Sequence, residues 1–376
     1  MDADYQAGLE KSGFGAVAGF RPDRQDYLAA SLMLLSILVF FAPVILGGVF
    51  FFRDICTEIV PKRGFLSQSG LQVLWNPYLF FGLPTAANMQ SSVFYPLNFI
   101  FHLGSTPVAL SYYIILHFMI ALAGTYALVR SLRGSAPAAL AGALAFTYGG
   151  FFISCGNQVV VLSSAAWIMP LLWAAGRALF TGRRGFIVGA GMFWAMQVLG
   201  GEPEIAYLSG IILIIFFAGL VLGGRIELSA REAIRRCAFI ITASVVLALC
   251  LSSVQWILTL ELSGISNRAG GLSYEDALKW SLEPGALGTL FVPNYIMDPT
   301  ENNLWVLGFR TSQLPYLLSV YPGVAALVLV LFGLRGAGCR TLIFMGGALL
   351  FLLLSLGRYG GVYWLFYHLL PMRKYP

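Results

Sequence analysis

Long uncharged and mostly apolar runs dominate the chain, and short clusters of charge separate them. The runs cover residues 27–52, 64–129, 134–176, 205–224, 237–260 and 311–334. A helix needs roughly 20 apolar residues to cross a bilayer core, so each run can span once and the two longest can span more often. We predict about ten membrane helices. Their ranges are 28–52, 107–129, 136–155, 159–180, 186–200, 204–222, 238–260, 314–334, 341–357 and a tenth from 361 to the end of the chain.

The composition narrows the class of protein further. Of the 376 residues, 58% are hydrophobic and only 11% are charged, whereas about 25% of residues are charged in typical soluble domains. This scarcity of charge argues against a soluble globular protein, a disordered chain and a nucleic-acid binder. Barrel strands are only about ten residues long and alternate in polarity. We therefore predict an all-α polytopic membrane protein.

The basic residues divide unequally between the two sides of the predicted bundle. Fourteen fall on one side: Lys11, Arg21, Arg24, Arg130, Arg133, Arg177, Arg183, Arg184, Arg225, Arg231, Arg235, Arg236, Arg335 and Arg340. Seven fall on the other: Arg53, Lys62, Arg63, Arg268, Lys279, Arg310 and Arg358. Cytoplasmic loops carry the excess of Lys and Arg, so we expect residues 1–27 to form a cytoplasmic segment. Most of the net charge of +6 then reflects orientation in the cell inner (cytoplasmic) membrane.

Two long connections then lie on the outer face of one transmembrane domain that covers residues 28–376. They are residues 53–106 and 262–313, and both are rich in aromatic residues. Loops longer than about 12–15 residues are usually functional or disordered, and their aromatic content argues against disorder. We therefore expect the chemistry on the outer face. The end of the chain resembles the exit of a helix, so we expect the native protein to continue beyond residue 376.

Candidate catalytic residues open the first outer loop. Asp54 and Glu58 follow the first predicted helix, and residues four apart share a face if that helix continues for one more turn. Two carboxylates at the membrane boundary suit a general base, metal ligands or a receptor for a hydroxyl group. The alternative is that both are ordinary interfacial charges at a helix end.

The rest of this loop carries no charge from residue 64 onward and is rich in aromatic and carboxamide side chains. Such a loop could pack on the membrane surface. It could also bind a polyol, whose hydroxyl groups need amide partners and whose C–H faces suit aromatic rings. The candidate ligands for a sugar are Trp75, Asn76, Asn88, Gln90 and Tyr95.

Two further acidic residues, Glu202 and Glu204, lie in a Gly-Gly-Glu-Pro-Glu turn at an outer helix end. Acidic residues at membrane depth are costly and are therefore functional candidates, although a solvated turn is the alternative. In the second outer loop, Arg268, Lys279 and Arg310 could hold a phosphate by charge-assisted hydrogen bonds.

The chain resembles the YfhO-like family of bacterial membrane proteins. The matching segments are WNPY (75–78), FGLP (81–84), NMQ (88–90), FYPL (94–97), GGEPE (200–204), PN (293–294), LGR (356–358) and LPMRKYP (370–376). That family is similar to the GT-C superfamily of glycosyltransferases, so the resemblance implies a GT-C-like helix bundle. It also implies a polyprenyl-phosphate sugar donor and a cell-envelope glycan or glycolipid acceptor.

The resemblance further implies roles for the acidic residues. Asp54 would be the catalytic base, supported by Glu58 or by Glu202 and Glu204. A divalent cation is a possible cofactor, with Asp54, Glu202 and Glu204 as candidate ligands. The spacing of Asp54 and Glu58 departs from the Asp-X-Glu pattern of the superfamily. We therefore expect a membrane glycosyltransferase, and the alternatives are a transporter or flippase of lipid-linked sugars or a non-catalytic scaffold of an envelope-synthesis complex.

Overall fold

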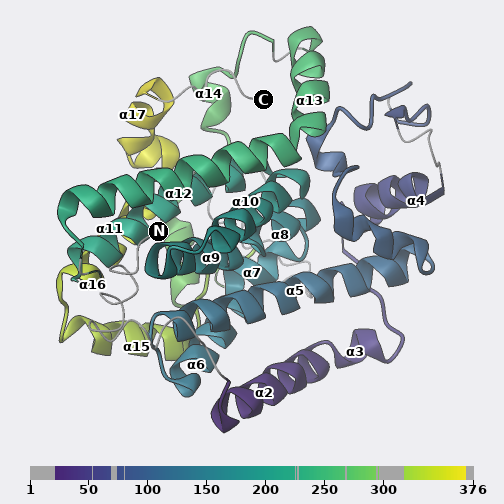
Figure 1. Cartoon of the computed structure of the whole chain (residues 1–376). Coiled ribbons are helices and arrows are strands. Elements are labelled where there is room, and N and C mark those ends of the chain that lie inside the picture. Colours follow the sequence, from purple (N-terminus) through teal and green to yellow (C-terminus); the bar gives the residue numbers. More distant parts are fainter. Residues whose placement is uncertain are drawn as a thin grey trace.

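The computed structural model describes residues 22–52, 54–68, 74–79, 81–224, 226, 228–266, 269–293, 295 and 317–369. Every regular element in these ranges is a helix. The central helix is α5 (Thr106–Ser131), which packs between α6 (Ala136–Thr147) and α9 (Ile168–Thr181). Next to α9, α10 (Arg184–Leu199) packs against α12 (Ala230–Leu251), so that these helices run side by side along the bundle (Figure 1).

The described chain contains four helical segments long and apolar enough to cross a membrane. They are α5, the continuous segment Val159–Thr181, α11 (Pro203–Leu222) and α12. Shorter apolar helices are α6, α10, α15 (Val324–Leu334) and α16 (Cys339–Ser355). The predicted α-helical membrane protein is confirmed at this level, and the count of ten membrane helices stays a prediction.

Several predicted spans are divided in the structure. The helix expected over 28–52 is α2 (Arg24–Phe40) followed by the short α3 (Ala42–Ile45). The chain turns there because Pro43 has no N–H to extend α2, and Gly47 takes a φ of +112°, which favours glycine. The helix expected over 136–155 is divided into α6 and α7 (Gly150–Cys155).

One other span begins and ends at new positions. The helix expected over 238–260 begins earlier, at Ala230, because the Ser229 hydroxyl caps it by accepting from Glu232 N at 3.3 Å. It ends at Leu251 and is followed by α13 (Ser253–Ile265). The remaining helices are η2 (Ile55–Ile59), α4 (Val60–Gln68), η4 (Met89–Ser91), η5 (Pro96–His102), α8 (Val159–Ala165), α14 (Tyr274–Ala277), η6 (Pro284–Leu290), η8 (Gly357–Tyr359) and α17 (Val362–Leu369).

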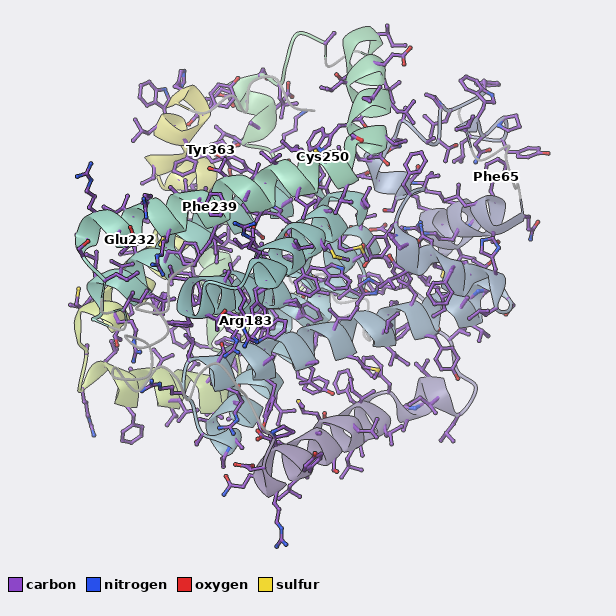
Figure 2. The ribbon with its side chains drawn as sticks, in the orientation of Figure 1. Phe65, Arg183, Glu232, Phe239, Cys250 and Tyr363 are labelled. Carbon is purple, nitrogen blue, oxygen red and sulfur yellow. The ribbon has the colours of Figure 1, made fainter. Side chains whose placement is uncertain are left out.

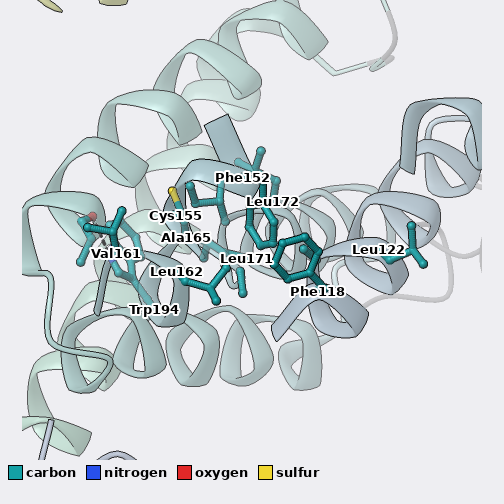
Figure 3. Packing of buried hydrophobic residues seen from close by; sticks show 14 of the residues in the cluster. Phe118, Leu122, Phe152, Cys155, Val161, Leu162, Ala165, Leu171, Leu172 and Trp194 are labelled. Atoms are coloured by element: carbon teal, nitrogen blue, oxygen red, sulfur yellow. Dashed lines mark hydrogen bonds between the residues drawn. The ribbon is translucent and has the colours of Figure 1, made fainter. Parts of the chain in front are cut away.

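The core lies where α5, α7, α8 and α9 meet (Figure 3). Phe118 of α5 contacts Phe152 of α7 edge to face, with ring centroids 4.9 Å apart. A Cβ added at Gly124 of α5 would lie 2.5 Å from Cδ of Pro170 on α9. Membrane helices approach closely where small residues line the contact, so Gly124 permits the tight packing of α5 on α9.

The bundle has two chemically different ends. We call the end that carries Asp26, Arg130, Arg183 and Glu232 the arginine end. The opposite end, which we call the α4 end, carries α4, η4, η5 and α13 beyond the far ends of α5 and α12 (Figure 1). Figure 2 labels Glu232 at the first end and Phe65 of α4 at the second.

Candidate functional site

Asp54 lies at the α4 end, immediately before the π-helical segment η2, which continues directly as α4. The first helix does not continue to Asp54 and Glu58, because η2 and α4 form a separate helix. The half-buried Asp54 carboxylate accepts a hydrogen bond from Nε2 of Gln158 at 3.2 Å. Glu58 is 57% exposed and forms an ion pair with the buried Lys62 at 2.8 Å. The two carboxylates thus have different partners.

Two carboxamides of the uncharged loop stabilise its backbone. The buried Asn76 pairs with Leu83 through backbone hydrogen bonds of 2.8 and 2.9 Å, and its side chain accepts from Tyr78 N at 2.9 Å. Asn88 caps η4 by accepting from Gln90 N at 3.0 Å. The loop therefore has a defined local structure in its described part, and the side chains of Trp75 and Gln90 are exposed on it.

Tyr95 anchors the loop in the bundle. Its buried hydroxyl accepts from Nε1 of Trp167 at 2.8 Å and contacts Nε2 of His117 at 2.7 Å. Because Nδ1 of His117 lies 2.7 Å from the carbonyl of Tyr113, which can only accept, we assign the proton to Nδ1 and let Tyr95 donate to Nε2. Burial raises the pKa of Tyr95 well above its ordinary value. The predicted sugar ligand is thus a buried anchor in this structure.

The Gly-Gly-Glu-Pro-Glu turn joins α10 to α11 and packs against both the loop and α8. Ser92 of the loop and Ser163 of α8 each donate to the carbonyl of Gly200 at 2.8 Å. Gly201 has a φ of +108°. A Cβ there would lie 3.0 Å from the Met89 carbonyl oxygen. Glycine at this position therefore permits both the backbone conformation and the close approach of the loop.

The two carboxylates of this turn differ in environment. Glu202 is half-buried before the first turn of α11, whereas Glu204 is exposed. Burial, and to a smaller extent the nearby charge of Glu204, raise the pKa of Glu202 to about 7. A carboxyl group with such a pKa exchanges a proton at neutral pH, which suits a general acid or base.

One short helix connects the two acidic positions. Gln158, which binds Asp54, precedes the first residue of α8, and Ser164, which accepts from the backbone N–H of Glu202 at 3.2 Å, lies near its last. Six residues of helix rise by about 9 Å. Asp54 and the Glu202 turn therefore lie at opposite ends of α8, on the same side of the molecule as the uncharged loop.

A shared metal centre does not form from these groups. Across the described ranges, no set of three or more His, Cys, Asp or Glu side chains is arranged to hold a metal ion. The candidate ligands Asp54, Glu202 and Glu204 therefore do not gather as one site in this structure.

The second outer loop contains the three basic residues that we predicted as phosphate ligands. Lys279 is 58% exposed and pairs with Asp276 at 2.7 Å, so its ammonium group already has an anionic partner. The other two predicted phosphate ligands, Arg268 and Arg310, lie outside the described residues.

Several residues of the site could not be identified from the sequence. Four uncharged residues within apolar runs hold the acidic positions: Gln158, Ser92, Ser163 and Ser164. Only their hydrogen bonds in the structure show this role. Arg63 was counted among the basic residues that set orientation, yet it is buried at 2% exposure.

Comparison with protein-family models, with curated proteins and with solved structures found no match to this chain.

Proposed function

We propose that this chain is an integral membrane glycosyltransferase that uses a polyprenyl-phosphate sugar as its donor. The acceptor is a cell-envelope polymer or glycolipid, and the reaction takes place at the α4 end, which we assign to the outer face. The observation that carries the proposal is the attachment of both acidic positions, Asp54 and Glu202, to the single helix α8 beneath an uncharged aromatic loop.

The proposed chemistry uses Asp54 as the general base. Its carboxylate takes the proton of the acceptor hydroxyl, the acceptor oxygen bonds to the anomeric carbon, and the bond from that carbon to the phosphate oxygen breaks. The lipid phosphate leaves with the electron pair of that bond, so the anomeric configuration is inverted. Gln158 orients the base through its hydrogen bond to Asp54. Glu202, whose pKa is about 7, can exchange a proton of its own at neutral pH.

The position of the Gly200–Glu202 turn favours an enzyme over a transporter. A transporter of this kind binds its substrate near the bilayer midplane, between broken halves of a helix. Here the turn lies between the last residue of α10 and the first residue of α11, at a helix terminus. The carboxylate is therefore placed at the end of the bundle and not halfway along it.

Replacement of Asp54 tests the base assignment. In a strain that lacks the native gene, we expect Asp54→Asn to lower envelope glycosylation by a factor of about 10² or more, as for loss of a general base. The matched control is Glu261→Gln, which removes an exposed carboxylate of α13 at the same end of the bundle. Protein levels in the membrane fraction are measured for both variants.

Three outcomes separate the hypotheses. Normal glycosylation in Asp54→Asn at a normal protein level contradicts the base assignment. Normal glycosylation in a variant that lacks the carboxylates of Asp54, Glu202 and Glu204 together supports a scaffold. Purified protein that moves lipid-linked sugar between leaflets of a vesicle without transferring the sugar supports a flippase.

A further inference from the structure

A cluster of arginines opens α12 at the arginine end. Residues 231–236 hold three arginines, Arg231, Arg235 and Arg236, against one acidic residue, Glu232. NH2 of Arg235 and Nε of Arg236 pair with the Glu232 carboxylate at 2.8 and 2.7 Å, so one carboxylate serves two guanidinium groups. Arg231 is exposed, and the Arg235 side chain is 77% exposed. The cluster therefore presents excess positive charge on the surface.

The arginines are not needed to start the helix. The Ser229 hydroxyl caps α12, and Glu232 supplies an acidic side chain in its first turn, where the helix dipole favours negative charge. Arginines at the same place oppose the dipole and repel one another. A negatively charged group outside the chain would reduce both unfavourable effects.

The positive charge extends across this end of the bundle. Arg183 and Arg184 are exposed in the connection from α9 to α10, and Arg335 is exposed in the connection from α15 to α16. Neither connection, 181–184 or 334–340, contains an acidic residue. The arginine end therefore has a charge that is complementary to a bilayer surface with anionic lipids.

An exposed apolar stripe continues from the arginines along α12. Phe239, Val246 and Leu249 are 61%, 54% and 48% exposed. Arg235 follows Arg231 by four residues, Phe239 follows Arg235 by four, and the next two steps are seven and three residues. These are the spacings of one helix face. The arginines thus lie at the head of an exposed apolar face.

The outer position of α12 makes this face accessible to lipid. Only 17% of its most apolar 18-residue stretch is buried, whereas the corresponding value for α5 is 67%. Figure 2 shows Phe239 between Glu232 and Cys250 along this helix. The helix rises by about 15 Å from Phe239 to Leu249. This length is about half of a hydrocarbon core of roughly 30 Å, which is the depth of one leaflet.

We propose that this face of α12 binds an anionic phospholipid. The phosphate lies at Arg231 and Arg235, and an acyl chain lies along Phe239, Val246 and Leu249. Guanidinium groups bind phosphate oxygens by charge-assisted hydrogen bonds, and the apolar stripe faces the chain. Both arginines were predicted from the sequence only as determinants of orientation.

The combination of charge and apolar surface favours a lipid over other anions. A soluble phosphate would bind the arginines but would leave the stripe without a role. An acidic protein would match the charge, but the stripe has the length of a leaflet and belongs to a helix that can span a membrane. A zwitterionic phospholipid offers the same chain and phosphate, but its ammonium group cancels the charge. The site therefore discriminates by net charge of the headgroup.

Lipid-induced stabilisation of the purified full chain tests the site. We measure the apparent melting temperature in detergent with three probes: phosphatidylglycerol, phosphatidylcholine with the same acyl chains, and glycerol 3-phosphate as a soluble headgroup. The two lipids are compared at equal mole fraction in the micelle. A ligand that binds the folded state raises its stability with the logarithm of ligand concentration over Kd. We expect a clearly larger rise with phosphatidylglycerol than with phosphatidylcholine, and none with glycerol 3-phosphate.

Charge variants of α12 locate the binding. The double variant Arg231→Gln with Arg235→Gln should weaken binding of phosphatidylglycerol by at least about tenfold, since each arginine near an anionic lipid contributes about fivefold. Both side chains are exposed, so the melting temperature without lipid should change little. Arg231→Lys with Arg235→Lys keeps the charge and should retain most of the affinity. Glu232→Gln removes the shared carboxylate and should strengthen binding several-fold.

A matched pair of arginines controls for overall charge. Arg183→Gln with Arg184→Gln removes the same charge from the same end but leaves α12 intact, and should weaken binding much less. The proposed glycosyl transfer does not enter this binding measurement, so a failure of the proposed function leaves the lipid site untouched.

Each result supports the site or overturns it. Equal melting shifts with phosphatidylglycerol and phosphatidylcholine overturn the charge preference, and the absence of any shift overturns binding. A shift with glycerol 3-phosphate that equals the lipid shift overturns the lipid as ligand and leaves a site for soluble phosphate. Equal losses in the α12 and the Arg183–Arg184 double variants overturn the placement on α12, because overall charge then accounts for the binding.

Discussion

Ser164 fixes the backbone at Glu202. Its hydroxyl accepts from the N–H of Glu202 at 3.2 Å and donates to the carbonyl of Gln197 at 2.8 Å, so one side chain of α8 bridges the end of α10 and the start of α11. Ser164 is fully buried. The acidic turn is therefore held by side chains from the loop and from α8. The backbone conformation of the turn depends on the residues that lie within these contacts.

Gly201 is the residue of this turn that should tolerate substitution least. Gly201→Ala introduces a Cβ 3.0 Å from the Met89 carbonyl oxygen and closer still to the Ser92 hydroxyl, at a φ of +108°. We expect a loss of about 1–3 kcal/mol of folding free energy from backbone strain and overpacking. The control Gly264→Ala adds a Cβ to α13 where no atom lies within 4 Å, and should be neutral or slightly stabilising. Thermal unfolding in detergent compares the two.

The raised pKa of Glu202 predicts how stability changes with pH. Because burial and Glu204 raise the pKa from 4.5 to about 7, the folded state binds a proton more tightly than the unfolded state. The stabilising contribution of the neutral carboxyl is therefore complete below pH 4.5 and is lost as the pH rises through about 7. Glu202→Gln keeps the side chain neutral, so the stability advantage of the variant over wild type should be small near pH 5 and reach about 2 kcal/mol above pH 8, after partial solvent screening.

The neighbouring carboxylate provides the control for that prediction. Glu204→Gln removes the like charge that helps to raise the pKa of Glu202. The pH at which stability declines should therefore move to a lower value, while a decline remains because burial is the larger cause. Unfolding midpoints measured between pH 5 and pH 9 give both curves. Parallel curves for wild type and Glu202→Gln across this range would contradict the assignment of the raised pKa to Glu202.

The helical membrane architecture could be predicted from the sequence because it depends on run length and charge. The boundaries could not, because they depend on local chemistry within apolar runs. Pro43 and Gly47 divide the first predicted helix, and Ser229 starts α12 well before the apolar run does. Hydropathy alone gives little weight to a single proline, glycine or capping serine.

The candidate site shows the same limit. Asp54 and Glu202 were identifiable because a carboxylate is conspicuous in an apolar chain, and α8 connects the segments that hold them. Tyr95, in contrast, was predicted as a sugar ligand, but its partners Trp167 and His117 come from helices 72 and 22 residues away. Whether a tyrosine hydroxyl is buried or exposed to solvent depends on such distant partners. The spacing of residues along the sequence does not reveal these partners.

The Tyr95 hydroxyl should contribute strongly to stability. Tyr95→Phe leaves the Trp167 N–H and the His117 Nε2 buried without their partner. Because each buried and unsatisfied group costs about 1–3 kcal/mol, we expect a loss of about 2–4 kcal/mol, with loosening of the loop from α5. Tyr78→Phe is the matched control, since the Tyr78 ring is 83% exposed, and it should change the unfolding midpoint little. Equal effects of the two variants would contradict the anchoring role of Tyr95.

Asp26 and Arg130 should hold α2 to α5 at the arginine end. Nε and NH2 of Arg130 donate to the Asp26 carboxylate at 2.7 and 3.0 Å, and the Tyr126 hydroxyl donates at 2.6 Å. Asp26 is 5% exposed but lies at the rim of the bundle. Asp26→Asn removes the nearer of the two carboxylates that pair with Arg130 and leaves Asp23 at 3.8 Å, so we expect a loss of about 2–3 kcal/mol, near the low end for buried pairs. Glu232→Gln, in an ion-paired cluster with Arg235 and Arg236, should cost less.

The same ion pair predicts an acid-sensitive contribution to stability. Asp26 precedes the first apolar run. Burial acts to raise the pKa of Asp26, but hydrogen bonds from Arg130 and Tyr126 have the larger combined effect. They hold the pKa at about 2, below the ordinary value of 3.8. Because the folded state prefers the charged form, its contribution is complete above pH 3.8 and is lost as the pH falls through about 2. The stability gap between wild type and Asp26→Asn should be constant from about pH 5 to pH 8 and narrow below about pH 4. A gap that widens on acidification in detergent would show that Arg130 does not favour the charged form of Asp26.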